Sequence, residues 1–116
     1  MDERIEKWLY DIKSAIDEIN SYFATEEKDF LQYRANIMLK RAIERDLEII
    51  GEAINRIITR DSSFIDKISD SKAIIGLRNQ VIHAYDSISD ENIWAILINH
   101  LPKLKTEIDA LIDKAQ

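Results

Sequence analysis

The residues best suited to chemistry lie in one short stretch of the chain, between Gly76 and Tyr85. Arg78 precedes His83 by five residues. On a helix at about 100° per residue, Asn79 and His83 share one face, and Arg78 and Tyr85 share an adjoining one. Gly76 lies two turns before His83 on the same face, where its missing side chain leaves room for a neighbouring helix or a ligand.

These side chains suit proton transfer beside an anionic group. A histidine with its usual pKa of about 6.5 exists in both protonation states near neutral pH, so it can act as a base or an acid. The planar arginine fork donates to two phosphate oxygens and keeps its charge. An arginine and a histidine at this spacing also occur by chance in many helices, as a surface charge and a partly buried ring. The spacing alone is therefore a weak signal.

Other chemistries are disfavoured. The chain has no cysteine, and its second histidine, His100, precedes Leu101-Pro102 with no other polar chemistry nearby, so we expect it to be structural or exposed. Neither a His-x3-His pattern nor a paired carboxylate–histidine pattern is present, and we therefore expect no metal site. Glycine-rich phosphate loops are missing too, and no cofactor is expected.

Composition indicates one globular domain over residues 1–116. Hydrophobic residues make up 46% of the chain, which is enough for a packed core, and no uncharged apolar run approaches the roughly 20 residues of a membrane span. The acidic start, MDERIEKWLYDIK, lacks the apolar centre of a signal peptide, so a cytoplasmic location is the simplest expectation. The net charge of −6 argues against a protein that coats nucleic acid. Residues 34–83 are nevertheless locally basic between two acidic flanks, which allows one local phosphate site.

Apolar spacing predicts helices throughout. Steps of three and four place one stripe along the first segment, at Ile5, Trp8, Leu9, Ile12, Ala15, Ile16, Ile19 and Phe23, before Thr25-Glu26-Glu27 breaks it. A longer helix is expected from about Phe30 to about Thr59, with an inner face formed by Tyr33, Ile37, Ile43, Leu47, Ile50, Ile54 and Ile57. Leu39, Ile49 and Ala53 widen that face, which indicates packing on more than one neighbour.

The second half of the chain predicts two more helices. Asp61-Ser62-Ser63 supplies loop and N-cap chemistry, and a helix from about Asp70 to about Tyr85 should turn Ile74, Leu77 and Val81 inward. After the loop-like residues 86–89, Ser89 should cap a last helix that runs to about Lys114. Pro102 removes one hydrogen bond of that helix and should kink or divide it. The prediction is an all-α antiparallel bundle of four to five helices.

The long helix carries a polar row at steps of four, three and four: Arg41, Arg45, Glu48 and Glu52. Such a row is commonly a solvated face with weak ion pairs. It could instead line a cleft, with Arg41 or Arg45 binding phosphates and Glu52 orienting an arginine. We favour a structural or dimer-interface role for the carboxylates and leave the arginines open. Gly51, beside Glu52, is expected to mark a close helix crossing.

Three segments resemble a known family. Residues 78–85, RNQVIHAY, resemble the Arg-x4-His-x-Tyr signature of the HepT toxins, a branch of the HEPN superfamily. Residues 45–53, RDLEIIGEA, resemble a block of that family's long helix. Residues 90–94, DENIW, followed by residues 101–104, LPKL, resemble its C-terminal helix. Order, spacing and length agree over nearly the whole chain.

The resemblance implies an all-helical, HEPN-like homodimer in which the two Arg-x4-His motifs face one cleft. It implies a metal-independent ribonuclease toxin with Arg78 and His83 as catalytic residues. The implied partner is an MNT-type nucleotidyltransferase antitoxin, which would neutralise the toxin by transferring AMP to Tyr85. A phosphate-bearing adduct there would block the RNA path beside Arg78, whereas a tyrosine near a helix end more commonly just covers the core.

The residues fit RNA cleavage without a metal. That reaction needs a base for the ribose 2′-OH, an acid for the leaving 5′-oxygen, and positive charge on the phosphate. One chain offers one candidate histidine, so base and acid require two chains or a substitute such as water, which favours a dimeric site. Asn79 could bind either His83 or the phosphate. The alternative from another class is a non-catalytic helical module that binds a nucleotidyltransferase, and a plain structural bundle is a third.

Overall fold

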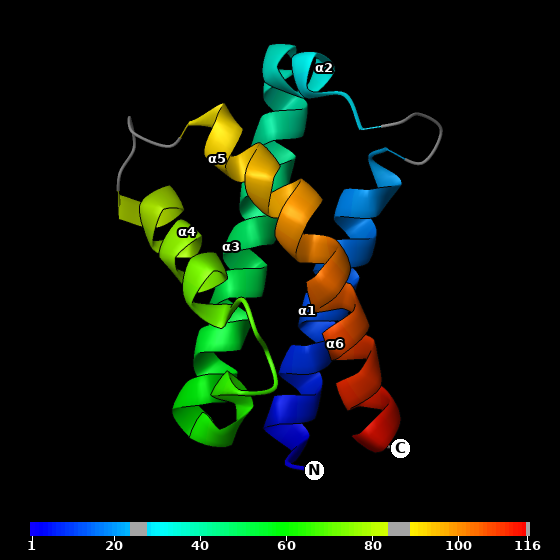
Figure 1. Cartoon of the computed structure of the whole chain (residues 1–116), viewed down its shortest axis with the longest axis vertical. Helices are drawn as coiled ribbons and strands as arrows, with labels where there is room; N and C mark the ends of the chain where they lie inside the picture. Colours follow the sequence, from blue (N-terminus) through cyan, green and yellow to red (C-terminus); the bar gives the residue numbers. More distant parts are fainter. Residues whose placement is uncertain (24–27, 84–88, 116) are drawn as a thin grey trace.

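The structure, a computed structural model, describes residues 1–23, 28–83 and 89–115, and of residues 80–83 the backbone alone. Within these ranges the regular elements are all helical, which confirms the predicted all-α class. The helices α1 (Glu3–Ser21), α3 (Ile37–Arg60) and α6 (Leu101–Ala115) form the body of the bundle (Figure 1). Helix α1 is antiparallel to both α3 and α6. None of the described helices is long and apolar enough to cross a membrane.

Helix α1 follows its predicted stripe closely. The Asp2 side chain caps it by accepting hydrogen bonds from the backbone N–H groups of Arg4 and Ile5. Its buried residues are Ile5, Leu9, Ile12, Ala15, Ile16 and Ile19. Phe23 lies beyond the end of the helix, and Thr25-Glu26-Glu27 falls outside the described residues.

The prediction of one continuous helix from Phe30 to Thr59 was wrong at Asn36. This residue is extended, at φ −106° and ψ 98°, and separates the short α2 (Phe30–Ala35) from α3. Its side chain accepts a hydrogen bond from the backbone N–H of Leu39, at 3.0 Å, so it acts as the N-cap of α3. The break turns Ile37 away from the core, and this residue is 68% exposed instead of inward-facing.

Helix α3 is the central element, as its wide apolar face predicted. It packs against α1, α2, α4 and the short 3-10 turn η1 (Ser62–Ile65). Its buried apolar positions are Ile43, Leu47, Ile50, Ala53, Ile54 and Ile57. Because α3 contacts all of these elements, its side chains determine how far the other helices lie from one another.

Helix α4 (Ser71–His83) carries the candidate catalytic stretch and lies at the edge of the bundle (Figure 1). Asp61 caps η1 before it, as expected, by accepting from the N–H of Ser63. Ile74 and Leu77 are buried, which confirms two of the three predicted inward positions. The side chain of Val81 and the predicted end of the helix near Tyr85 lie outside the described residues.

The C-terminal helical run is interrupted just before Pro102. Helix α5 (Asp90–Ala95), capped by Ser89, leads into a π-helical segment η2 (Ile96–His100) and then into α6. Proline has no N–H for a regular helical bond, and the wider π turns accommodate this lost donor. The helical run continues through Pro102, the second residue of α6, so the expected interruption takes the form of a change of helix type at Ile96–His100 just before the proline.

An aromatic cluster attaches α5 to α2. The ring of Trp94 lies 5.3 Å from that of Tyr33, 5.7 Å from that of Phe30 and 6.1 Å from that of Phe23, measured between centroids. Trp94 makes edge-on contacts with Phe23 and Phe30 and a tilted contact with Tyr33, and these separations are in the range that aromatic pairs prefer. Trp94 is therefore a packing residue, and it is distinct in its surroundings from Trp8, the other tryptophan of the chain.

A buried carboxyl links α1 to α3. The Tyr22 hydroxyl lies 2.9 Å from Oδ2 of Asp46 and 2.8 Å from Oε1 of Glu18. A hydroxyl has one hydrogen, so it cannot donate to both carboxylates at once. Asp46 is only 3% exposed, and this burial raises the pKa of its carboxyl above the ordinary 3.8, against the lowering effect of the Tyr22 hydrogen bond.

We expect Asp46→Asn to stabilise the protein most at neutral pH. Because the pKa of Asp46 is higher in the folded state than in the unfolded state, the folded state holds more protons between the two values, and stability falls as the pH rises through that interval. Asparagine keeps an acceptor for Tyr22 but cannot ionise. Urea unfolding at pH 4 and pH 7 measures the effect, with the exposed Asp66→Asn as control. A variant that is equally destabilised at both pH values would contradict the prediction.

Candidate functional site

Arg78 is positioned by the close crossing of α3 and α4 at Gly51. A Cβ added to Gly51 would lie 2.4 Å from Cβ and 2.9 Å from Cγ of Arg78, and 3.2 Å from the carbonyl oxygen of Ile74. A side chain at this position would force Arg78 or the helix to shift, and the missing Cβ lets the Arg78 stem lie directly on the backbone of α3. The expected close crossing of the two helices at Gly51 is confirmed, and it determines where the stem of Arg78 lies.

The Arg78 guanidinium is held by groups from both helices. Its Nη2 donates to Oε2 of Glu52, and its Nη1 donates to Oδ1 of Asn79 at 2.7 Å. The other oxygen of Glu52 accepts from Nε of Arg56 at 3.0 Å. Glu52 therefore accepts hydrogen bonds from two arginines. This is consistent with the option, left open by the sequence, that Glu52 orients an arginine.

A cleft of about 350 Å³ opens beside Arg78. Its lining residues come from α1, α3 and α4: Trp8, Asp11, Arg45, Glu48, Ile49, Glu52, Ala53, Arg56 and Arg78. Of the two arginines left open by the sequence, Arg45 lines this cleft, paired with Glu48 at 3.4 Å. Arg41 is not among the lining residues and pairs with Glu44 at 2.9 Å, so the structure does not bring it to Arg78.

Arg56 was not predicted as a site residue. It follows Glu52 by four residues and continues the polar row, so its spacing could have placed it in the cleft. Trp8 packs against the core as its place in the apolar stripe of α1 predicted, but it is only partly buried and also lines the cleft, which the stripe did not indicate. The spacing of apolar residues shows which face of a helix packs against the core, but not which residues at the edge of that face reach solvent.

His83 is the last residue of α4 that the structure describes, and its side chain is not described. Its backbone stands five residues beyond Arg78, which corresponds to about 7.5 Å along the helix axis. Tyr85 falls outside the described residues. Asn79, on the same face of α4 as His83, is exposed and accepts a hydrogen bond from Arg78. The sequence had suggested only His83 or a phosphate as its partner.

His100 belongs to a different part of the molecule. It lies in η2, with Nδ1 2.9 Å from Oδ2 of Asp70, and the expectation of no polar chemistry nearby was wrong. The hydrogen bond with His100 is the first cause that holds the pKa of Asp70 below its usual range. The predicted structural role fits this pairing, which joins the start of α4 to the C-terminal run.

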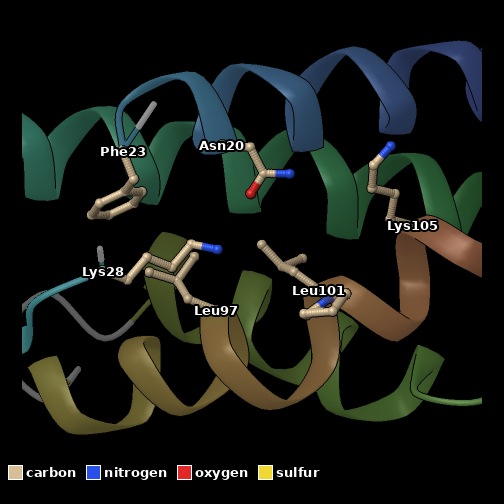
Figure 2. A pocket seen from close by; sticks show the side chains of 7 residues that line it. Asn20, Phe23, Lys28, Leu97, Leu101 and Lys105 are labelled. Atoms are coloured by element: carbon tan, nitrogen blue, oxygen red, sulfur yellow. The ribbon is translucent and has the colours of Figure 1, made fainter. Parts of the chain in front are cut away.

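A separate hollow of about 610 Å³ lies between the end of α1 and the η2–α6 run. Figure 2 shows Asn20 of α1 pointing into it across from Leu97 and Leu101, with the side chain of Lys28 also extending into it. Phe23, Pro102 and Lys105 complete its lining, and it shares no residue with the Arg78 cleft. It contains none of the predicted site residues. Among the residues that the structure describes, no group of three or more His, Cys, Asp or Glu could hold a metal ion.

Comparison with known proteins identifies the family. Residues 12–111 match the family described as Ribonuclease HepT-like. "Putative RNase MJ1380" of Methanocaldococcus jannaschii is 35% identical over 107 residues, which cover 90% of this chain and 94% of the relative. "Probable ribonuclease HepT" of Thermococcus cleftensis is 29% identical over 104 residues, covering 90% and 92%. No solved structure gives a significant match. The chain belongs to the HepT-like ribonuclease family, as residues 78–85 indicated.

The two glycines provide a matched pair of substitutions. Gly51→Ala should destabilise the protein by about 1–3 kcal/mol, because its Cβ would collide with the Arg78 stem. Gly76 has nothing within 4 Å of its added Cβ, so Gly76→Ala should stabilise α4 by up to about 1 kcal/mol. Urea unfolding at a concentration where the chain is monomeric measures both. Equal effects of the two substitutions would show that the helices do not cross closely at Gly51.

Proposed function

We propose that this chain is a metal-independent endoribonuclease of the HEPN type, in which Arg78 binds the phosphate and His83 transfers protons. The observation that carries the proposal is the position of Arg78. It is a charged side chain fixed by Gly51 and Glu52 at the edge of a surface cleft, in a chain of the HepT-like ribonuclease family. The five-residue spacing to His83 places an acid–base group one to two helical turns further along α4.

The chemistry needs only groups that the chain provides. A neutral imidazole removes the proton of the ribose 2′-OH, and the 2′-oxygen attacks the phosphorus. The bond from phosphorus to the 5′-oxygen breaks, and an imidazolium protonates that leaving oxygen, which yields a 2′,3′-cyclic phosphate and a 5′-hydroxyl. The Arg78 guanidinium stabilises the charge on the non-bridging oxygens. Its bonds to Glu52 and Asn79 fix its plane before substrate arrives, which reduces the reorganisation needed.

A homodimer would supply the second histidine. His100 is occupied with Asp70 and does not line the Arg78 cleft, so His83 is the candidate of each chain. In the part of the chain that the structure describes, α4 packs mainly against α3. Lys72, Gly76 and Asn79, on the face of α4 that includes position 83, are exposed. The open space at Gly76 lets the α4 helix of a second copy approach closely, which would bring two motifs together.

The family resemblance extends the proposal to a toxin–antitoxin pair. An MNT-type nucleotidyltransferase would neutralise the ribonuclease by adding AMP to Tyr85, two residues after His83. The alternative function, a non-catalytic module that binds such a partner, is favoured by one surface feature. Three large apolar side chains are exposed where α2 meets α3: Leu31 at 70%, Ile37 at 68% and Met38 at 84%. An exposed patch of this kind suits a protein contact, whereas the arrangement around Arg78 suits catalysis.

We expect His83→Ala to abolish RNA cleavage, with a loss of at least about a hundredfold in kcat. His100→Ala is the matched control, because it removes the other histidine of the chain, and it should retain cleavage. Cleavage of a labelled RNA with EDTA present measures both variants, and circular dichroism confirms that each is folded. Cleavage that survives in purified His83→Ala would refute His83 as the proton-transfer group, and a folded wild-type chain that cleaves no RNA would favour the non-catalytic module.

Co-expression with the nucleotidyltransferase partner should increase the mass of the chain by one or more AMP units. Tyr85→Phe removes the acceptor hydroxyl and should abolish the increase, while Tyr10→Phe should not. Intact-mass spectrometry followed by peptide mapping locates the adduct. An adduct on any other residue, or an unmodified chain that is still neutralised, would contradict the assignment of Tyr85.

A further inference from the structure

Two adjacent hollows lie along α1 and α3 beside Arg78. The Arg78 cleft adjoins a second hollow of about 400 Å³, lined by Trp8, Asn55, Arg56, Thr59 and Arg60. Trp8 and Arg56 line both hollows, so the two are adjacent, and we call them together the Trp8 groove. From Arg45 to Arg60 it follows α3 for about 22 Å at 1.5 Å per residue.

The groove has one arginine more than its carboxylates can neutralise. Asp11 is paired with Lys7 at 2.8 Å, Glu48 with Arg45 at 3.4 Å, and Arg60 with Asp2 at 2.8 Å. Glu52 alone serves both Arg56 and Arg78. The middle of the groove therefore carries an excess positive charge although the whole chain has a net charge of −6. Arg56 is 56% exposed, so its guanidinium is accessible to a ligand.

The remaining surfaces of the groove suit a base and a sugar. Trp8 is anchored against the core and contributes to both hollows, so its position is fixed while part of the indole lines the groove. A rigid aromatic surface of this kind is a stacking platform for any nucleobase. Asn55 and Thr59 are exposed and add neutral polar groups beside it, of the type that can bind a ribose hydroxyl.

We propose that the Trp8 groove binds the single-stranded RNA that leads to Arg78, with a base stacked on Trp8 and a phosphate bound by Arg56. The inference rests on the proposed ribonuclease function and adds a substrate-binding track outside the Arg78–His83 motif. About 22 Å accommodates on the order of six stacked nucleotides at about 3.4 Å each. That length is within the range of about 4–16 nucleotides known for single-strand sites built on stacking and positive charge.

Tryptophan fluorescence tests the stacking directly. The probe is a 2′-O-methyl RNA of about eight nucleotides, which lacks the attacking hydroxyl and remains uncleaved. In a Trp94→Phe background the only indole is Trp8, and bound RNA should quench it. Trp8→Leu keeps an apolar side chain but removes the aromatic face, and it should raise the Kd roughly five- to hundredfold, while Trp8→Phe should retain most of the affinity. Binding that neither quenches Trp8 nor weakens in Trp8→Leu would overturn the proposal.

Salt dependence tests the role of Arg56. Arg56→Gln should weaken binding of the same RNA and reduce the slope of log Kd against log salt by about 0.7, the value for one phosphate contact on a single strand. Arg34→Gln removes an equal charge from α2, outside the groove, and should leave the slope unchanged. Identical slopes for the two variants would contradict a phosphate contact at Arg56.

The outcomes separate this inference from the proposed function. If the groove is right, Trp8→Leu raises KM with little change in kcat, whereas His83→Ala lowers kcat and leaves the Kd of the 2′-O-methyl RNA near that of the wild type. Cleavage that depends on His83 but not on Trp8 or Arg56 would refute the groove alone. Binding to Trp8 by a chain that cleaves nothing would refute the proposed function alone. A groove occupied instead by a protein segment or a second copy would show no quenching by RNA.

Discussion

The close crossing of α3 and α4 at Gly51 is the constraint on which the rest of the site depends. Because Gly51 has no side chain, the stem of Arg78 lies against the backbone of α3, and its guanidinium reaches the carboxylate of Glu52 on the next residue. Removing a guanidinium from water is costly unless an anion compensates, and Glu52 provides that compensation. The glycine and the glutamate therefore act as one unit: the first allows the approach and the second stabilises the charge that the approach partly buries.

That unit also explains how an acidic protein can present a cationic site. A net charge of −6 repels a polyanion at long range, but screening limits this effect to about 8–10 Å at physiological ionic strength. Within the groove, the ion pairs neutralise each acid locally, and the shared Glu52 leaves one arginine in excess. A short, local contact with RNA is compatible with this distribution, whereas extended coating of nucleic acid is not. The charge pattern thus favours an enzyme that meets its substrate at one place.

The sequence predicted those features that depend on one local rule. Apolar periodicity identified most of the buried positions of α1 and α3, the signature residues indicated the family, and Gly51 indicated the close crossing. The sequence prediction failed at Asn36, because a single asparagine can cap a new helix where propensity allows the old one to continue. Arg41 and Arg45 could not be separated from the sequence, since both lie on the same row and only the packing of α4 decides which of them faces the cleft. The partial exposure of Trp8 depends in the same way on where neighbouring helices end.

Asn79 resolves a geometric difficulty in the motif. Arg78 and His83 are five residues apart, so their positions differ by about 140° around α4, and Arg78 begins on the side that packs against α3. Asn79 lies on the face of position 83 and accepts from Nη1 of Arg78 at 2.7 Å, while Nη2 donates to Glu52 on α3, so the guanidinium is held between α3 and that face. A phosphate bound by Arg78 would then lie at the boundary between the α3 cleft and the outer face of α4, where no atom of this chain lies within 4 Å of a Cβ added to Gly76. The spacing of the motif therefore suits a reaction at the junction of two protomers better than one enclosed within a single bundle.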